Sequence, residues 1–429
     1  MIEVVKKYIV RYKTQVQNLG LYFLAALIPM VLNLVSNPFF AKNMSPTDYA
    51  ITGYYSSFTS LFGTFVNFYI LHYYNKRYFE LDAENREKLK ATIFKFLCTF
   101  SFLLFAIALA IVFIYSKYFN SDSQIPFFPY AIMSMVVMPL AGIVTLTSVD
   151  YRMAREGKKF FRLSVTNGVL AILLSLLFVV VIKWGAFGKM LGSVITTLGM
   201  FLFILYINRD CLKVKFDWKI LKDALLFCWP LVIAAMLNFF TNGYDKVFLE
   251  RLGDVRTLGI YSVGVSIAGY LRLFSTSIED TFQPDIFKTI VDRDFRKCAM
   301  YVGIKLTIMS VCVVAFIIFC PFIIKILTFG RYVEATPYAR IISLSALTSM
   351  LYSSFSQAVI ALGYTGITLS NKIIGSILSI VSFNLLISNF GAEGAAWGLV
   401  LSYVYLLVGY AILVYIKYKK DKLKQIKNA

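Results

Sequence analysis

The sequence predicts an all-α integral membrane protein, with about twelve transmembrane helices in two pseudo-symmetric six-helix bundles around a central cleft. Three observations predict it: the composition, the spacing of the apolar runs and an internal repeat. Of the 429 residues, 59% are hydrophobic and 15% are charged, and the mean hydropathy is +0.71. Soluble domains are roughly 45–50% apolar and about 25% charged. A soluble globular fold is therefore excluded.

Twelve apolar runs are separated by polar, glycine or proline residues. A membrane-spanning helix needs about 20 mostly apolar residues, and each run is long enough. The spans expected in the first half are 18–41, 49–75, 91–116, 126–149, 160–183 and 187–207. Those expected in the second half are 221–247, 257–277, 299–325, 336–361, 367–388 and 394–416.

The basic residues alternate between the two sides of these spans. Assigned loop by loop, 32 Lys and Arg fall on one side and nine on the other; Lys305 and Lys372 are counted with the loops of the richer side. Basic loops stay in the cytoplasm, so both termini are predicted to be cytoplasmic. Termini on the same side require an even number of spans, which agrees with twelve.

A shift of 206 residues aligns the sequence with itself in two separate blocks. The first block pairs Asp48 with Asp254, Gly53 with Gly259, Tyr55 with Tyr261 and Ser56 with Ser262. The second pairs Gly185 with Gly391, Ala186 with Ala392, Gly188 with Gly394 and Gly192 with Gly398. We interpret residues 1–209 and 210–429 as homologous bundles, inserted the same way up and related by an axis along the membrane normal. Rocking such bundles would open a central cleft to each side in turn, as in a transporter.

The sequence lacks the residues that several classes of function require. The six cysteines form no CxxC pair, and the one histidine, His72, cannot make a metal centre alone, so no metal site is expected. We attribute the net charge of +20 to orientation in the membrane and not to nucleic-acid binding. No phosphate-binding glycine loop, nucleophile elbow or HExxH motif occurs. We therefore expect no enzyme activity and no cofactor; a coupling ion, Na+ or H+, is one way to drive transport.

Two arginines are left over when the basic residues are assigned to loops, and both lie inside predicted spans, where charge is costly and usually faces a cavity or a partner. Arg272 lies well within 257–277. It is interpreted either as a cleft residue that binds a pyrophosphate or acidic sugar, or as a side chain that reaches the inner headgroups. Arg340 lies one turn inside 336–361, and the same two interpretations apply.

Asp245 and Lys246 follow the polar run NFFTNGYDK at the outer end of the span 221–247. Adjacent opposite charges at this depth have two interpretations. They form either a gating or ion-coupling pair, or a salt bridge at the membrane interface.

The first span of each half contains a proline, Pro29 or Pro230, that is expected to act as a hinge. Proline bends a helix, which a membrane tolerates where the segment packs on protein or lines a cavity. Each proline precedes two asparagines four residues apart: Asn33 and Asn37, then Asn238 and Asn242. This spacing places each pair on one helix face. The asparagines either line the cleft and bind sugar hydroxyls, or hydrogen-bond between helices.

Aromatic residues are abundant, with 28 tyrosines and 39 phenylalanines. Most are expected in interfacial belts and in packing. Tyr69, together with Tyr54 and Tyr55 on the same span, is a candidate for stacking on a sugar ring.

Three stretches carry a resemblance to a known family: MSPTDYAITGYYSSF, the residues 229–269 that begin WPLVIAAMLNFFTNG, and the residues 361–403 that begin ALGYTGITLSN. On these residues the chain resembles the polysaccharide-transporter branch of the multidrug/oligosaccharidyl-lipid/polysaccharide exporter superfamily, and within it Wzx-type O-antigen flippases. The resemblance implies a carrier in the bacterial inner membrane. It would move undecaprenyl-pyrophosphate-linked oligosaccharide, for lipopolysaccharide O-antigen or capsule, to the outer leaflet by alternating access. It also implies a cationic cleft, which Arg272 fits, and polysaccharide assembly proteins as further partners.

Two other functions are alternatives to a flippase. A drug or small-molecule antiporter of the same superfamily tends to carry buried acidic residues in its N-terminal half, and no Asp or Glu lies within 18–41, 49–75 or 91–116. A membrane glycosyltransferase or polymerase generally needs a large loop outside the membrane, and the loops here are short.

Overall fold

The computed structural model describes residues 2–292, 294–361 and 365–428, and within these ranges every regular element is a helix. The long helices are α1 (Ile2–Asn43), α2 (Pro46–Val66), α4 (Ala83–Ile114), α5 (Tyr130–Met153), α6 (Gly157–Leu176), α7 (Gly185–Ile207), α8 (Trp218–Met236), α11 (Val255–Val291), α12 (Phe295–Leu327), α13 (Thr336–Ala361) and α14 (Thr365–Asn428). The short ones are α3 (Leu71–Arg77), α9 (Phe239–Asn242) and α10 (Tyr244–Glu250).

Nine helices in the described ranges are long and apolar enough to cross a membrane. The prediction of an all-α, multi-pass membrane protein is confirmed. The count of twelve stays a prediction, partly because the two last expected spans, 367–388 and 394–416, both lie in α14, which turns sharply at Gly391.

The chain divides into two compact units. The first contains the residues up to Ser45, Phe58–Ser121 and Pro126–Ile233, and the second contains Pro46–Ser57, Asp122–Ile125 and the residues from Ala234. The chain thus passes from one unit to the other at the start of α2, within α2, on both sides of Asp122–Ile125 and within α8. The sequence-based limit between residues 209 and 210 stays a prediction.

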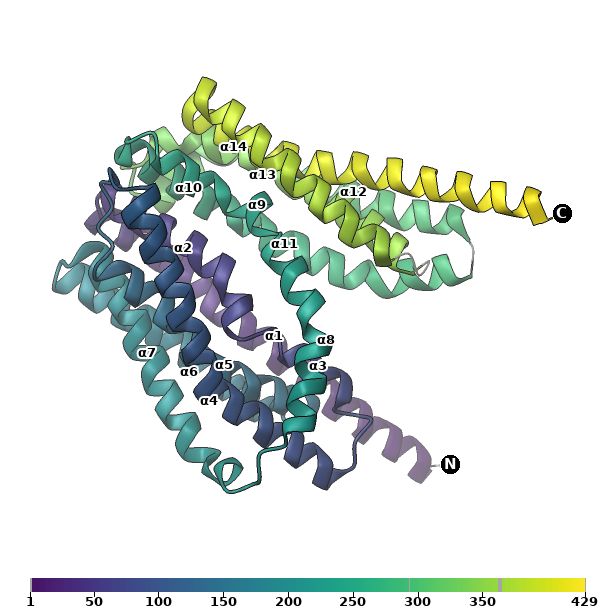
Figure 1. Ribbon diagram of the computed structural model, residues 1–429. Helices are drawn as coiled ribbons and strands as arrows, with labels where there is room; N and C mark the ends of the chain where they lie inside the picture. Colours follow the sequence, from purple (N-terminus) through teal and green to yellow (C-terminus); the bar gives the residue numbers. More distant parts are fainter. Residues whose placement is uncertain (1, 293, 362–364, 429) are drawn as a thin grey trace. The chain divides into compact units, whose positions relative to one another are not determined.

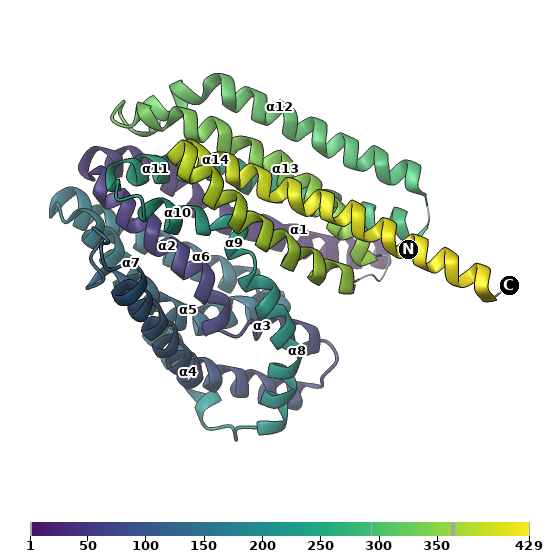
Figure 2. The ribbon, with the colours of Figure 1, turned by 45° about the horizontal axis from the view of Figure 1, so that its top comes forward.

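In the first unit, α1 packs on α6, and α5 packs on α4 and α7. Its core is apolar and aromatic, and includes Tyr74, Phe94, Leu97, Ile143 and Ile204. In the second unit, α13 packs on α11, α12 and α14, while α9 and α10 pack on α14. Figures 1 and 2 show α12, α13 and α14 side by side along most of their length.

The expected span 49–75 is wrong as a continuous helix, because α2 ends at Val66 and α3 begins at Leu71. Between them Phe68 and Tyr69 adopt positive φ angles of 49° and 52°, which side chains with a Cβ rarely adopt. Contacts from outside the helix hold this interruption. The Asn67 side chain donates to Met138 O at 3.2 Å, and Cys228 Sγ donates to Tyr69 O at 3.5 Å.

The expected span 221–247 is also wrong as one helix, because it comprises α8, α9 and α10. The helix continues through Pro230 and stops only after Met236. At the interruption the backbone closes tight i to i+3 turns: Asn238 N bonds to Ala235 O and Phe240 N to Leu237 O. Such turns leave carbonyl groups for partners outside the helix.

The internal repeat is visible in the backbone. Gly185 and Gly391, which the 206-residue shift pairs, have φ angles of +52° and +55°. Glycine reaches this conformation at little steric cost. Another pair of glycines that the repeat aligns, Gly53 and Gly259, lies where α2 and α11 cross in the second unit. A Cβ on Gly53 of α2 would lie 2.3 Å from Ser262 Oγ, and one on Gly259 of α11 would lie 1.9 Å from Pro46 O. The paired glycines therefore let α2 and α11 approach each other closely.

Candidate functional site

The interruption between α8 and α10 is the centre of a polar cluster in the second unit. Asn238 and Asn242, both predicted as cleft residues, flank and end the one-turn helix α9. Asn242 Nδ2 donates to Thr241 Oγ1 at 2.9 Å, so its Oδ1 atom faces other partners. The predicted substrate residues of this helix therefore lie at a local break in the regular backbone.

Arg272 of α11 reaches this break. Its Nη2 atom donates to Asn242 Oδ1 at 2.8 Å and to the Tyr403 hydroxyl at 2.7 Å. Tyr403 of α14 in turn donates to Asn242 Oδ1 at 2.8 Å. Three helices thus fix the guanidinium in place. Neither Nη1 nor Nε of Arg272, whose side chain is exposed, bonds to any residue that the structure describes.

A second cation, Lys372 of α14, lies on the same interruption. Its Nζ atom donates to Asn238 Oδ1 at 3.2 Å and to Ala234 O at 3.4 Å. The neighbouring Ser376 hydroxyl donates to Leu237 O at 3.2 Å. Side chains of α14 therefore satisfy the carbonyl groups that the broken helix leaves free.

The cluster is positively charged. In the described part of the chain, no carboxylate forms an ion pair with Arg272 or Lys372. Both cations are held by neutral amide, hydroxyl and carbonyl groups. No acidic side chain among the described residues therefore offsets their positive charge, which is available to an anionic ligand. A planar guanidinium with free N–H groups suits a phosphate or a carboxylate in particular.

The cluster includes two residues that the sequence prediction missed. Lys372 was counted with a loop, although it falls within the apolar run 367–388, and a lone lysine there was the available signal. Tyr403 gave no signal, because it is one of many tyrosines in apolar runs.

The predicted residues of α1 belong to the first unit. The ring of Pro29 packs on α6, where a Cβ on Gly168 would lie 2.7 Å from Pro29 Cβ. Asn33 is exposed and Asn37 is half-buried. Nothing tests whether these three residues line a cleft, and their roles stay predictions.

Tyr69 lies in the interruption between α2 and α3, where its ring centroid is 3.9 Å from that of His72. Tyr54 and Tyr55 are both buried and pack edge to face on each other. Of these tyrosines, only Tyr69 is partly exposed. Its role in sugar stacking stays a prediction.

Asp245 and Lys246 have different surroundings. The Tyr261 hydroxyl donates to Asp245 Oδ2 at 2.6 Å, and Asp245 is only 1% exposed. Lys246 lies near Gly53, where a Cβ would be 3.7 Å from Lys246 Cδ. Among the described residues the two form no ion pair with each other or with a third residue. Asp245 Oδ1 is buried without a hydrogen-bond partner in that part of the chain, which leaves it able to bind a cation.

Arg340 lies apart from the cluster. Its Nε atom donates to Ile317 O of α12 at 3.0 Å, and the side chain is exposed. No group of three or more His, Cys, Asp or Glu side chains within the described ranges is arranged to hold a metal ion.

Residues 39–300 match the model of a protein family described as "Polysaccharide biosynthesis protein". The match covers more than half of the chain. The chain belongs to this family. The matched segment includes the interruption at α9 and Arg272, so part of the cluster lies within the family's shared region.

Two curated proteins are similar to this family member in sequence. The chain is 25% identical over 262 residues to an uncharacterized membrane protein, MJ1375, of Methanocaldococcus jannaschii, a match that covers 56% of this chain and 61% of that protein. It is 23% identical over 291 residues to the capsular polysaccharide biosynthesis protein CapF of Staphylococcus aureus, covering 64% of this chain and 72% of CapF. The chain thus spans less than two thirds of the length of MJ1375.

Solved structures share the fold. The lipid II flippase MurJ in an inward closed conformation has a TM-score of 0.68 at 15% identity, covering 92% of this chain and 87% of MurJ. An inward-facing multidrug resistance transporter of the MATE family has a TM-score of 0.65 at 14% identity, covering 94% of this chain and 99% of the transporter. Family and fold together confirm the resemblance to the polysaccharide-transporter branch, and they exclude the globular-enzyme architecture that the composition also excluded.

Proposed function

We propose that the protein is a flippase for undecaprenyl-pyrophosphate-linked oligosaccharide. It moves the repeat unit of an O-antigen or capsule from the cytoplasmic to the outer leaflet of the bacterial cytoplasmic membrane by alternating access. Membership of a polysaccharide biosynthesis family and the transporter fold support this class of activity. The reaction moves a lipid and makes or breaks no covalent bond, so the protein is not an enzyme in this proposal.

One observation carries the proposal: Arg272 and Lys372 meet at an interrupted helix of a membrane protein without a carboxylate partner among the described residues. Placing charge in a membrane is costly and is retained for function. A pyrophosphate group is multiply negative and is the part of the substrate that most resists transfer through hydrocarbon. The two cations would compensate its charge, while Asn238, Asn242 and Tyr403 offer hydrogen bonds to phosphate oxygens or sugar hydroxyls.

The interruption also supports a conformational role. Backbone that is not helical is tolerated at membrane depth where it lines a cavity or packs on protein, and such segments bind substrate in many transporters. Because Arg272 of α11 and Lys372 of α14 both bond to asparagines at α9, an anion that binds both cations would tie these three helices of the second unit together. Substrate binding would then bias a rearrangement of this unit.

A drug antiporter is the alternative function within this superfamily. Such a protein would bind lipophilic cations, and the cationic cluster disfavours them by charge repulsion. Two acids of the second unit, Asp245 and Glu250, are buried, and Asp245, whose Oδ1 atom has no hydrogen-bond partner among the described residues, is our candidate for coupling a Na+ or H+ gradient to either activity.

Reconstitution of the purified full chain in liposomes tests the proposal. Lipid-linked oligosaccharide with a fluorescent sugar is incorporated, and a membrane-impermeant quencher measures how much reaches the opposite leaflet. We expect faster equilibration than in liposomes without protein. A parallel set with a cationic dye reports drug transport. Movement of the dye without movement of the oligosaccharide would overturn the flippase proposal and favour an antiporter.

A further inference from the structure

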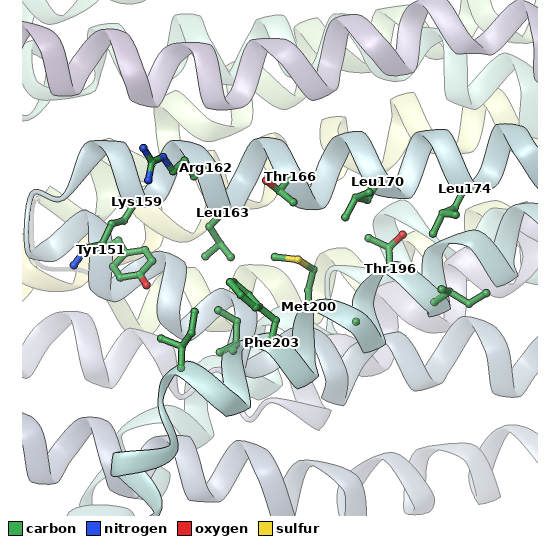
Figure 3. A pocket seen from close by; sticks show the side chains of 14 residues that line it. Tyr151, Lys159, Arg162, Leu163, Thr166, Leu170, Leu174, Thr196, Met200 and Phe203 are labelled. Carbon is green, nitrogen blue, oxygen red and sulfur yellow. The ribbon is translucent and has the colours of Figure 1, made fainter.

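A long groove runs along the first unit between the end of α5 and the helices α6 and α7, with a volume of about 660 Å³. Figure 3 shows Tyr151, Lys159 and Arg162 at one end, and Leu170 and Leu174 towards the other. Thr196, Met200 and Phe203 of α7 form the facing wall. The groove therefore has a polar end and an apolar body.

The polar end is basic. Lys159 Nζ forms an ion pair with Glu156 at 2.9 Å and lies 5.6 Å from the centre of the Tyr151 ring. Arg162 is exposed, and within the described ranges it has no hydrogen-bonded or ion-paired partner. Between residues 150 and 162 the chain has five basic and two acidic side chains. One of the acids, Asp150, is already bound by Lys90 and Tyr74, so the end of the groove keeps an excess of positive charge.

The apolar body opens on a surface that a membrane would cover. Leu170 is 41% exposed, Ile195 41% and Phe203 54%, and all three lie in helices that are long and apolar enough to span a bilayer. Exposed large apolar side chains at the mouth of a groove favour occupation by hydrocarbon. The occupant therefore has an anionic group at one end and a hydrocarbon chain along the rest.

The length of the groove distinguishes between lipids. From Arg162 to Leu174 the helix rises about 18 Å, at roughly 1.5 Å per residue. One leaflet of a bilayer has a hydrocarbon depth of about 15 Å. The groove thus matches a phospholipid that extends through one leaflet, and it is short for an undecaprenyl chain.

We propose that this groove binds an anionic phospholipid of the cytoplasmic leaflet. The phosphate lies on Arg162 and Lys159, and one acyl chain lies along α6 and α7. The predicted orientation places the loop between α5 and α6 in the cytoplasm. Basic pockets between helices on this side of a membrane bind the headgroups of anionic lipids. The site is separate from the Arg272 cluster, and the proposal does not depend on what the protein transports.

Native mass spectrometry of the detergent-purified full chain tests it, with phosphatidylglycerol and phosphatidylethanolamine of the same acyl chains as probes. We expect the wild-type protein to retain phosphatidylglycerol at least tenfold more tightly. The R162Q/K159Q variant should lose this preference. The G199F variant should bind neither lipid well, because Gly199 lines the groove and a Cβ there meets no atom within 4 Å, so an added side chain has room to enter the groove.

Matched controls keep the test specific. G303F adds the same side chain on α12, where a Cβ also meets nothing within 4 Å. R296Q/K297Q removes two exposed basic side chains at the start of α12, in the second unit. Both controls should bind like the wild type. Equal retention of the two lipids, or equal loss in the controls, would overturn the site. If undecaprenyl phosphate bound more tightly than phosphatidylglycerol, and G199F abolished that binding, the occupant of the groove would be an isoprenoid lipid and not a phospholipid.

Discussion

Arg272 Nη2 lies 2.8 Å from Asn242 Oδ1, and this bond joins α11 to the interrupted helix that precedes it. Tyr403 bonds to both atoms, so the guanidinium is held in one orientation although the side chain is exposed. A cation that is oriented in advance loses little conformational freedom when an anion binds. This pre-organisation is the physical basis for the following predictions about the cluster.

Replacing Arg272 by alanine is expected to slow flipping of a pyrophosphate-linked lipid about 10- to 100-fold, because a hydrogen bond to a charged group contributes about 1.5–3 kcal/mol. R272K should recover part of the rate, since lysine restores the charge but not the planar fork. The rate is measured in proteoliposomes at matched protein content. R256A is the control: Arg256 begins the same helix, but its exposed side chain pairs with Glu334 at 3.2 Å. Full activity of R272A would remove Arg272 from the site.

Lys372 is expected to act on the same anion. K372Q keeps hydrogen bonds to Asn238 and Ala234 available but removes the charge, so substrate binding should weaken about tenfold, with K372R close to the wild type. Binding of a soluble pyrophosphate-linked sugar analogue, measured by the quenching of an attached fluorophore, reports the affinity. K213Q serves as the control, because Lys213 is 77% exposed and pairs with Asp210 in a loop. If K372Q and R272A combined were no worse than either alone, the two cations would act as one unit.

The helices and the cationic character of the site could be predicted from the sequence, because apolar runs and a lone arginine are local signals. The interruptions could not. The break after Val66 depends on Met138 and Cys228, and the break after Met236 depends on Lys372 and Ser376, all distant in the sequence. Both prolines suggested bends, but the helix continues through Pro230. Asparagine spacing was informative, since Asn238 and Asn242 each bind one of the two cations.

The paired glycines Gly185 and Gly391 predict a difference in stability. Alanine at a positive φ costs about 1–2 kcal/mol, so G185A should lower the free energy of unfolding by that amount. G391A should cost more, because its ψ of −130° places it in a region that is nearly restricted to glycine. Thermal unfolding in detergent measures both. G303A is the control and should stabilise by about 0.5–1 kcal/mol, since Gly303 is inside a helix with open space at its Cβ. Equal melting temperatures for G185A and G303A would contradict the prediction.

Lys305 is a cation that the sequence assigned to a loop and that the structure buries completely in α12. Its Nζ atom has no hydrogen-bond partner among the described residues, and the nearby Glu279 carboxylate of α11 interacts with it electrostatically. Glu279 also accepts a hydrogen bond from Ser353 of α13 at 2.8 Å, so three helices meet at this pair. The carboxylate is therefore better satisfied than the ammonium group, which depends on Glu279 for compensation.

This asymmetry predicts that E279Q destabilises the protein by about 1–3 kcal/mol, because it removes the charge that compensates the buried ammonium group. The double variant K305M/E279Q should recover the wild-type stability or exceed it, since methionine fills the space of the lysine stem without charge. E334Q is the control, because the exposed pair of Glu334 with Arg256 contributes at most about 1 kcal/mol. Chemical unfolding in detergent measures all three. A double variant less stable than E279Q alone would show that Lys305 stabilises the fold independently of Glu279.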